Sequence, residues 1–215
     1  MVALLRIIDL THRINKDISL FPGAKGPVVT VVATIESDFY LEHEIMMGTH
    51  LGTHIDSPMH VLKQGKLLNE YDVSKFIGKA LVIDVEGLTF ITVDFLKQVP
   101  HIEEVEFILF KTGMDKYYGT ADYYKPFPVL DEKGAFFVAN LDNLKGIGVD
   151  SFSIDPIEPV SIDNHKIILG SDLIIIENLT HLYDLLNVDF TFSCLPLKFD
   201  EIEGCPVRAI AMIHE

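Results

Sequence analysis

Short apolar runs rich in β-branched residues recur along the chain, and they constrain its fold more than any other feature of the sequence. Each run is short enough for a strand and is bounded by Gly, Pro, Asp or Asn, which is typical of strands in a sheet. The predicted strands lie at residues 28–35, 80–85, 105–110, 135–138, 166–169, 173–176 and 207–213. We therefore expect more strand than helix.

The segments between these runs include three candidate helices, at residues 92–98, 140–144 and 179–186. Thr92 is a suitable N-cap for the first, with the acidic Asp94 in its first turn. Asn178 or Thr180 could cap the last. Strands and helices follow one another in mixed order, which predicts an α/β or α+β fold with a mixed sheet.

Charge and hydropathy exclude several kinds of partner. The formal net charge is −15, from 17 basic and 32 acidic residues, which argues against binding to nucleic acid. No apolar run approaches the roughly 20 residues that span a bilayer, so we expect no membrane partner. The opening residues lack the features of a secretory signal, and we expect a cytoplasmic protein.

The remaining stretches of sequence carry weaker signals. The chain has no Gly/Ser linker and no internal repeat, so we expect a single domain over residues 1–215. Residues 120–133 are rich in aromatic residues and proline without periodicity, which predicts a surface loop. Cys194 and Cys205 are too few for a disulfide framework. A bridge between them is open, but we predict buried, reduced thiols.

Residues 48–60 carry side chains of the metal-ligand type in the pattern H-x3-H-x-D-x3-H, at His50, His54, Asp56 and His60. On a helix, His50 and His54 would share a face and Asp56 would point away. The glycines, threonines and proline of the segment also disfavour a helix. In an extended segment every second residue faces the same side, so all four groups converge, with Pro58 bending the chain around His60.

This ligand set suits a catalytic metal ion. Imidazole nitrogens and a carboxylate oxygen bind zinc, manganese or iron(II), and two histidines with one aspartate leave coordination positions open. Metal-bound water at an open position can titrate near neutrality and supply hydroxide. A fourth group beside the metal, whether or not it is a ligand, could move protons.

A second segment, residues 165–177, supports this interpretation. It looks like two apolar strands joined by a turn at residues 170–172. Glu177 ends a run of aliphatic residues, where a carboxylate is costly unless it is paired, hydrogen-bonded or bound to a metal.

The 48–60 segment resembles the signature of the cyclase-like metal-dependent hydrolases, a family that includes bacterial kynurenine formamidase and isatin hydrolase. The matching residues run from Gly52 to His60 as Gly-Thr-His-Ile-Asp-Ser-Pro-Met-His, with His50 at the expected position upstream. The similarity covers nearly the whole chain. Further short matches lie at residues 8–12, 21–23, 112–113, 177–179 and 206–209.

The resemblance implies a mixed, barrel-like sheet flanked by helices, of the swivelling β/β/α type, and assembly into homodimers or larger homo-oligomers such as tetramers. By position, His50, His54 and Asp56 would hold a first ion, and Asp56 would bridge to a second. His165 would bind the second ion and Glu177 would contact both, while His60 would be the acid/base residue.

The resemblance also places Phe21 in the substrate pocket, where the formamidases carry a tryptophan. Phenylalanine can stack on an aromatic substrate, but it lacks the indole N–H donor.

We therefore expect a hydrolase that cleaves a carbon–nitrogen amide bond, linear or cyclic, in a small-molecule substrate. The expected cofactor is Zn²⁺ or Mn²⁺, with one or two ions per chain. Two alternatives stay open: a lyase or cyclase that uses the metal to stabilise an enolate, and a metal-binding protein without turnover. His60 argues against the last, because storage does not need a proton shuttle.

Overall fold

The computed structural model describes residues 5–157 and 162–214 of the chain. Its centre is a nine-stranded sheet that curls into a half-barrel, with the strand order β1-β13-β11-β5-β7-β9-β10-β4-β12. These strands are β1 (Leu5–Asp9), β4 (His54–Asp56), β5 (Ile77–Asp84), β7 (Phe107–Lys111), β9 (Gly146–Val149), β10 (Ile174–Glu177), β11 (Phe190–Ser193), β12 (Gly204–Pro206) and β13 (Ile210–His214). The expected α/β fold with a mixed, barrel-like sheet is confirmed.

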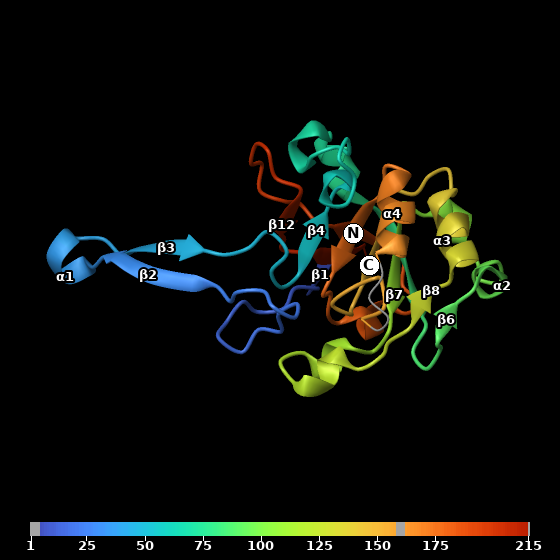
Figure 1. Cartoon of the computed structure of the whole chain (residues 1–215), viewed down its shortest axis with the longest axis horizontal. Helices are drawn as coiled ribbons and strands as arrows, with labels where there is room; N and C mark the ends of the chain where they lie inside the picture. Colours follow the sequence, from blue (N-terminus) through green and yellow to red (C-terminus); the bar gives the residue numbers. More distant parts are fainter. Residues whose placement is uncertain (1–4, 158–161, 215) are drawn as a thin grey trace.

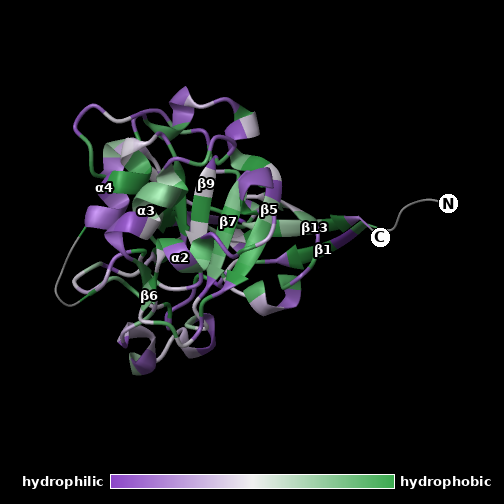
Figure 2. Cartoon of the chain, turned by 90° about the vertical axis from the view of Figure 1, so that its right-hand side faces the viewer, coloured by the Kyte–Doolittle hydropathy of each residue, from purple (hydrophilic) through white to green (hydrophobic). Residues whose placement is uncertain are grey.

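The smaller elements surround this sheet. The helices α2 (Val93–Leu96), α3 (Glu132–Ala139) and α4 (Asp163–Gly170) gather on one side of it (Figures 1 and 2). Two strands, β6 (Phe90–Ile91) and β8 (Val129–Leu130), form a small parallel pair. Short 3₁₀ helices complete the described chain: η1 (Pro58–His60), η2 (Leu68–Glu70), η3 (Val73–Phe76), η4 (Ile102–Glu104), η5 (Asp115–Tyr117), η6 (Ala121–Tyr124) and η7 (Leu182–Leu185).

Strands β5, β7, β9 and β10 run parallel and form the middle of the sheet. Strands β7, β9 and β10 are buried on both faces, which explains why their sequences are largely apolar rather than alternating, while β5 is exposed at Lys79 and Asp84. Phe107 and Leu109 of β7 pack into the cluster on the concave face, while Ile108 and Phe110 pack under the helices. The antiparallel strands β4 and β12 extend this sheet at one edge, and β11, β13 and β1 extend it at the other.

The strands β2 (Val28–Ala33) and β3 (Glu42–Met46), joined by α1 (Ile35–Asp38), form an arm that projects from the rest of the molecule (Figure 1). Its apolar side chains are open to solvent: Phe39 is 92% exposed, Met46 67%, and Val29 and Ile45 both 59%. A lone two-stranded ribbon is marginally stable in water, and contiguous exposed apolar surface marks an interaction site.

Several predicted elements are confirmed. The runs at 28–35, 80–85, 105–110, 173–176 and 207–213 correspond to β2, β5, β7, β10 and β13. The Thr92 hydroxyl accepts a hydrogen bond from the Phe95 amide at 3.3 Å and so caps α2. Cys194 and Cys205 are buried and free.

Two predicted strands are wrong, because residues 135–138 lie in α3 and residues 166–169 lie in α4. Short apolar runs do not distinguish a strand from a buried helical turn. The buried positions of α4 (Asn164, His165, Ile168 and Leu169) follow the helical repeat. The turn at 170–172 therefore joins a helix to a strand.

Two predicted helices are also largely wrong. Residues 140–144 form turns, and only η7 (Leu182–Leu185), preceded by His181, forms within 179–186. The predicted surface loop at 120–133 contains η6, β8 and the start of α3. Its Tyr123 is fully buried in an aromatic cluster and donates a hydrogen bond to Asn178 Oδ1 at 2.8 Å.

No helix within residues 5–157 and 162–214 has the length and hydropathy to cross a bilayer. Residues 1–4, which bear on the expected absence of a secretory signal, lie outside the described residues.

Candidate metal centre

Strand β4 places two of the predicted ligands on one face of the sheet. It lies between β10 and β12, with His54 opposite Glu177 and Asp56 opposite Gly204. Successive side chains alternate along a strand, so Ile55 enters the concave core while His54 and Asp56 face the side that carries α4. Immediately after β4, Pro58 begins the 3₁₀ turn that ends at His60. The predicted extended path is confirmed for His54–Asp56, and so is the bend at Pro58. It is wrong for His50, which lies in a turn and is separated from the strand by Gly52 at a φ of +61°.

The ring of His54 is held in one tautomer by the backbone. Its Nδ1 donates to the carbonyl of Gly52 at 2.7 Å. The lone pair therefore lies on Nε2, which is 3.5 Å from Asp56 Oδ1 and 3.5 Å from Glu177 Oε2. Gly52 has a φ of +61°, which favours glycine at this position.

His165 is oriented in the same manner by a carboxylate. Its Nδ1 lies 2.7 Å from Asp155 Oδ2, and the same carboxylate accepts the backbone N–H groups of His165 and Asn164 at the start of α4. The Nε2 of His165 consequently faces Glu177 Oε1 at 3.3 Å and Asp56 Oδ2 at 3.8 Å. Such an outer hydrogen bond is typical of histidines that ligate metals.

Asp56 is the most informative group of this cluster. It is fully buried, and its Oδ2 has no hydrogen-bond partner among the described residues. Its Oδ1 lies 2.6 Å from Nδ1 of His50. A buried carboxylate oxygen without a partner is costly, and the imidazole nitrogens around it are metal-ligand atoms. The residues therefore fit a bound cation.

Three groups of described residues have ligand atoms that all lie within 4.8 Å of one another, and two of them contain Asp56: His50, His54 and Asp56, and Asp56, His60 and His165. Glu177 stands between them and accepts the backbone N–H of Ile154 at 3.0 Å. These separations suit one or two divalent ions that share the Asp56 carboxylate.

Neighbouring carboxylates raise the pKa values of two histidines in this cluster. Burial lowers the pKa of His50, but the Asp56 and Glu203 carboxylates outweigh burial and raise it to about 9. For His165, burial is likewise outweighed by Asp155 and Glu177, and the pKa rises to about 10.

The pKa of His60 moves in the opposite direction. Partial burial lowers it, and the positive charges of His50 and His165 oppose the attraction of Asp56. His60 therefore favours the neutral form, unlike its two neighbours.

A cavity of about 360 Å³ opens beside these residues. Its wall includes all the imidazoles of the cluster and an apolar part formed by Phe21, Ala24, Phe152 and Ile157. The rings of Phe21 and Phe152 meet edge to face, with centroids 6.2 Å apart. The structure thus brings together His50, His54, Asp56, His60, His165, Glu177 and Phe21, while their individual roles stay predictions.

Sequence reasoning missed three polar residues at this site, Asp155, Asn178 and Glu203. Asp155 and Glu203 contact His165 and His50, and Asn178 lines the cavity. Asn178 lies within the short match at 177–179 and Glu203 lies three residues before the one at 206–209, which was the available signal. Asp155 had no such signal.

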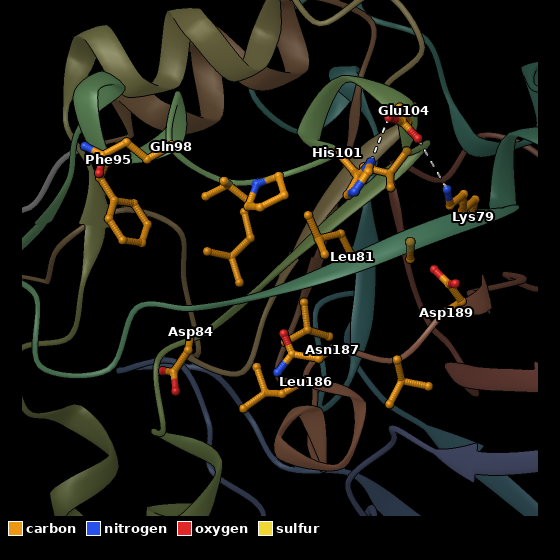
Figure 3. Close-up of a pocket in the computed structure, with 17 residues that line it drawn as sticks. Lys79, Leu81, Asp84, Phe95, Gln98, His101, Glu104, Leu186, Asn187 and Asp189 are labelled. Carbon is orange, nitrogen blue, oxygen red and sulfur yellow. Dashed lines mark hydrogen bonds and ion pairs between the residues drawn. The ribbon is translucent and has the colours of Figure 1, made fainter.

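A second cavity, of about 760 Å³, lies over β5 and has a different character. Leu81, Phe95 and Leu186 contribute to its apolar wall (Figure 3). At its edge His101 lies 2.8 Å from Glu104, and both side chains are largely exposed. None of the predicted site residues lines it.

Comparison with known proteins places the chain in a family. Residues 8–156 match the model of the family described as "Putative cyclase". The chain belongs to this cyclase family. The kynurenine formamidase of Bacillus cytotoxicus is 32% identical to this chain over 207 residues, which cover 94% of this chain and 95% of that protein.

Solved structures share the fold of this cyclase-family chain. Isatin hydrolase A from Labrenzia aggregata superimposes with a TM-score of 0.84 at 23% identity and covers 98% of this chain and 94% of its own. A predicted metal-dependent hydrolase from Bacillus stearothermophilus gives a TM-score of 0.79 at 24% identity, with 98% and 99% covered.

Proposed function

We propose that this protein is a metal-dependent hydrolase that cleaves a carbon–nitrogen amide bond in a small molecule. The observation that carries the proposal is the buried Asp56 carboxylate, whose Oδ2 atom has no partner among the described residues and whose two oxygens lie near nitrogens of His50, His54 and His165. The names of the related kynurenine formamidase and isatin hydrolase support amide hydrolysis, of a linear or a cyclic amide.

In this proposal His50, His54 and Asp56 hold one divalent ion, Zn²⁺ or Mn²⁺, and Asp56, His165 and Glu177 hold a second. The bound ion supplies Lewis acidity and lowers the pKa of a coordinated water towards neutrality. Asp155 and the Gly52 carbonyl hold the proton on Nδ1 of His165 and of His54, so Nε2 of each ring is the nitrogen left for an ion.

His60 is the proposed acid/base residue. Its ring packs on His50 with centroids 4.1 Å apart and lies 5.8 Å from the ring of His165, so it adjoins the whole cluster. A neutral imidazole at this place takes a proton from the attacking water and returns it to the leaving nitrogen. The lowered pKa keeps His60 in the form that can accept the proton.

Substrate is proposed to bind in the cavity of about 360 Å³, with its apolar part against Phe21 and Phe152. Phe21 is 59% exposed, so it offers a ring face to a planar substrate group. We place the enzyme in the cytoplasm, because both cysteines are free and a reducing compartment keeps them so.

The proposed enzyme acts as a homo-oligomer, a dimer or a tetramer. The exposed apolar arm of β2 and β3 supports this, since contact with a second chain would remove its valines and methionines from water.

Metal analysis combined with a substrate panel tests the proposal. The purified protein is expected to hold one or two divalent ions per chain and to hydrolyse members of a panel of formamides, lactams and cyclic imides. An enolate-based lyase would instead give eliminated or cyclised products, and a storage protein would give none. A protein that binds neither Zn²⁺ nor Mn²⁺ would overturn the central claim.

One substitution separates the two ions. His165→Ala is expected to lower the metal content by about one ion per chain and to leave the first site occupied. Full metal content and activity in this variant would make the two-ion assignment wrong.

A further inference from the structure

The segment that leads into β12 brings Glu203 onto His50, across 153 residues of sequence. The Oε1 atom of Glu203 lies 3.0 Å from Nε2 of His50. The same atom accepts a hydrogen bond from the Thr49 hydroxyl at 2.9 Å. The main-chain carbonyl of Glu203 accepts two more hydrogen bonds, from the amide of Ser57 at 2.8 Å and from its hydroxyl at 3.0 Å. Both the backbone and the side chain of Glu203 are thus fixed by the 49–57 segment.

Each ring nitrogen of His50 faces a carboxylate, Nδ1 facing Asp56 at 2.6 Å and Nε2 facing Glu203 at 3.0 Å. An ionised carboxylate can only accept, so both nitrogens donate in the metal-free protein. A metal ion at Asp56 would replace the proton on Nδ1, and Glu203 would keep the proton on Nε2. His54 and His165 show the same arrangement, with the Gly52 carbonyl and Asp155 as acceptors.

Close packing fixes the plane of the His50 ring as well. A Cβ at Gly204 would lie 2.6 Å from Cε1 of His50, so the backbone after Glu203 packs directly on the ring. The ring of His60 packs on it too, with centroids 4.1 Å apart. Glu203 therefore sets the orientation of a ring that has little other freedom.

We propose that Glu203 is a positioning residue for the metal centre, which accepts the Nε2 proton of His50 and thereby presents Nδ1 of that ring to the ion shared with Asp56. This inference rests on the proposed metal site. It differs from the alternative that Glu203 is itself a ligand, for which His50, His60 and Glu203 also lie close enough together.

The test compares Glu203→Gln and Glu203→Ala with Glu201→Gln, an exposed glutamate in the same loop that serves as the matched control. Affinity for Zn²⁺ alone is measured by competition with a chromogenic chelator, and the visible spectrum is recorded with Co²⁺ in place of zinc. Loss of an outer carboxylate costs about 10–100-fold in metal affinity. We expect that loss for Glu203→Ala, a smaller one for Glu203→Gln, a changed Co²⁺ spectrum in both, and unchanged metal stoichiometry.

The outcomes separate the possible roles. Loss of one whole metal ion in Glu203→Gln would show that Glu203 is a ligand. Unchanged Zn²⁺ affinity and an unchanged Co²⁺ spectrum in both variants would show that the contact is purely structural. Either result would overturn the inference. If Glu203→Ala does not fold, the same two measurements are made on Glu203→Gln and on Thr49→Val. The Thr49→Val variant removes the hydrogen bond that holds the Glu203 side chain. Failure of the unsubstituted protein to bind Zn²⁺ would instead refute the proposed function.

Discussion

His60 differs from the other three histidines of the centre, because its ring makes no hydrogen bond within the part of the chain that the structure describes. The rings of His54 and His165 are each locked by an outer acceptor, as a ligand requires. A ring that takes and returns a proton needs at least one nitrogen that no neighbouring group occupies, and His60 meets this requirement.

Replacing His60 with alanine is therefore expected to preserve the metal content and lower turnover. Positioned proton transfer contributes about 10²–10⁴-fold in rate, so kcat should fall by that order. Elemental analysis and steady-state kinetics on the same preparation provide the measurement. Loss of metal together with activity would show that His60 is a ligand.

The raised pKa values of His50 and His165 give a second prediction. With pKa values of about 9 and about 10 in the metal-free protein, both imidazoles are protonated at neutral pH. A nitrogen must lose its proton before it can ligate a metal. Filling both sites at neutral pH should therefore release about one proton from each ring, and the metal affinity should increase with pH towards these pKa values.

Calorimetric titration with Zn²⁺ in buffers of different ionisation enthalpy measures this release, and zero released protons would contradict it. The metal-free protein has the opposite pH dependence. The two raised pKa values contribute stability that is fully present below the ordinary histidine pKa of 6.5 and is lost as the pH rises through about 9 to 10.

At the scale of single residues, the sequence predicted only part of the site. The histidines and Asp56 were recognisable because they stand close together in a spacing that suits one extended segment. Asp155 and Glu203 were not, because the chain has 32 acidic residues and only the fold brings these two to the rings.

At the scale of elements, one hydroxyl joins β4 to two distant segments. The buried Thr53 accepts a hydrogen bond from the His12 amide at 3.0 Å and donates one to the Asn178 carbonyl at 2.6 Å. His12 follows β1 and Asn178 follows β10, so Thr53 ties both to the strand that carries the ligands.

Thr53→Val keeps the shape of this side chain and removes both hydrogen bonds. Each buried polar group left without a partner costs about 1–3 kcal/mol, so the free energy of unfolding should fall by at least that amount. Thr191→Val is the matched control, since Thr191 lies in β11 and its hydroxyl makes no hydrogen bond in the described chain. Urea unfolding measures the free energy of unfolding of both variants. Equal values for Thr53→Val and Thr191→Val would show that the Thr53 hydroxyl does not stabilise the fold.

The elements also show why the prediction of secondary structure failed where it did. Apolar runs in β5, β7 and β10 were identified correctly because parallel strands are buried on both faces. The equally apolar segments in α3 and α4 are helical because aspartate side chains accept hydrogen bonds from the backbone amides of their first turns. Asp131 accepts the Gly134 amide at 2.6 Å, and Asp155 accepts two amides of α4.

At the scale of the whole molecule, the arm is the surface through which we expect the proposed oligomer to form. Val29 pairs with Ile45 across the two strands, and Val31 lies on the same face of the ribbon. Placing a charge on this face would oppose its burial in an interface.

The double variant Val29→Lys/Val31→Lys is expected to be monomeric at concentrations where the unsubstituted protein is an oligomer. Val73→Lys is the control, because Val73 is 62% exposed and lies outside the arm. Analytical ultracentrifugation over a range of protein concentrations decides the matter. An unsubstituted protein that is a monomer throughout would exclude the proposed oligomer.

The position of β4 in the sheet has a consequence for how the protein is made in the cell. The strand carries His54 and Asp56, yet its two neighbours, β10 and β12, begin only at Ile174 and Gly204. A ribosome therefore releases the first histidines long before it makes the strands that hold them, and such late pairing of distant segments slows folding. On the proposed ligand set, an ion that meets the growing chain finds an incomplete binding site. Metal loading would then be the last step of maturation, after synthesis has ended.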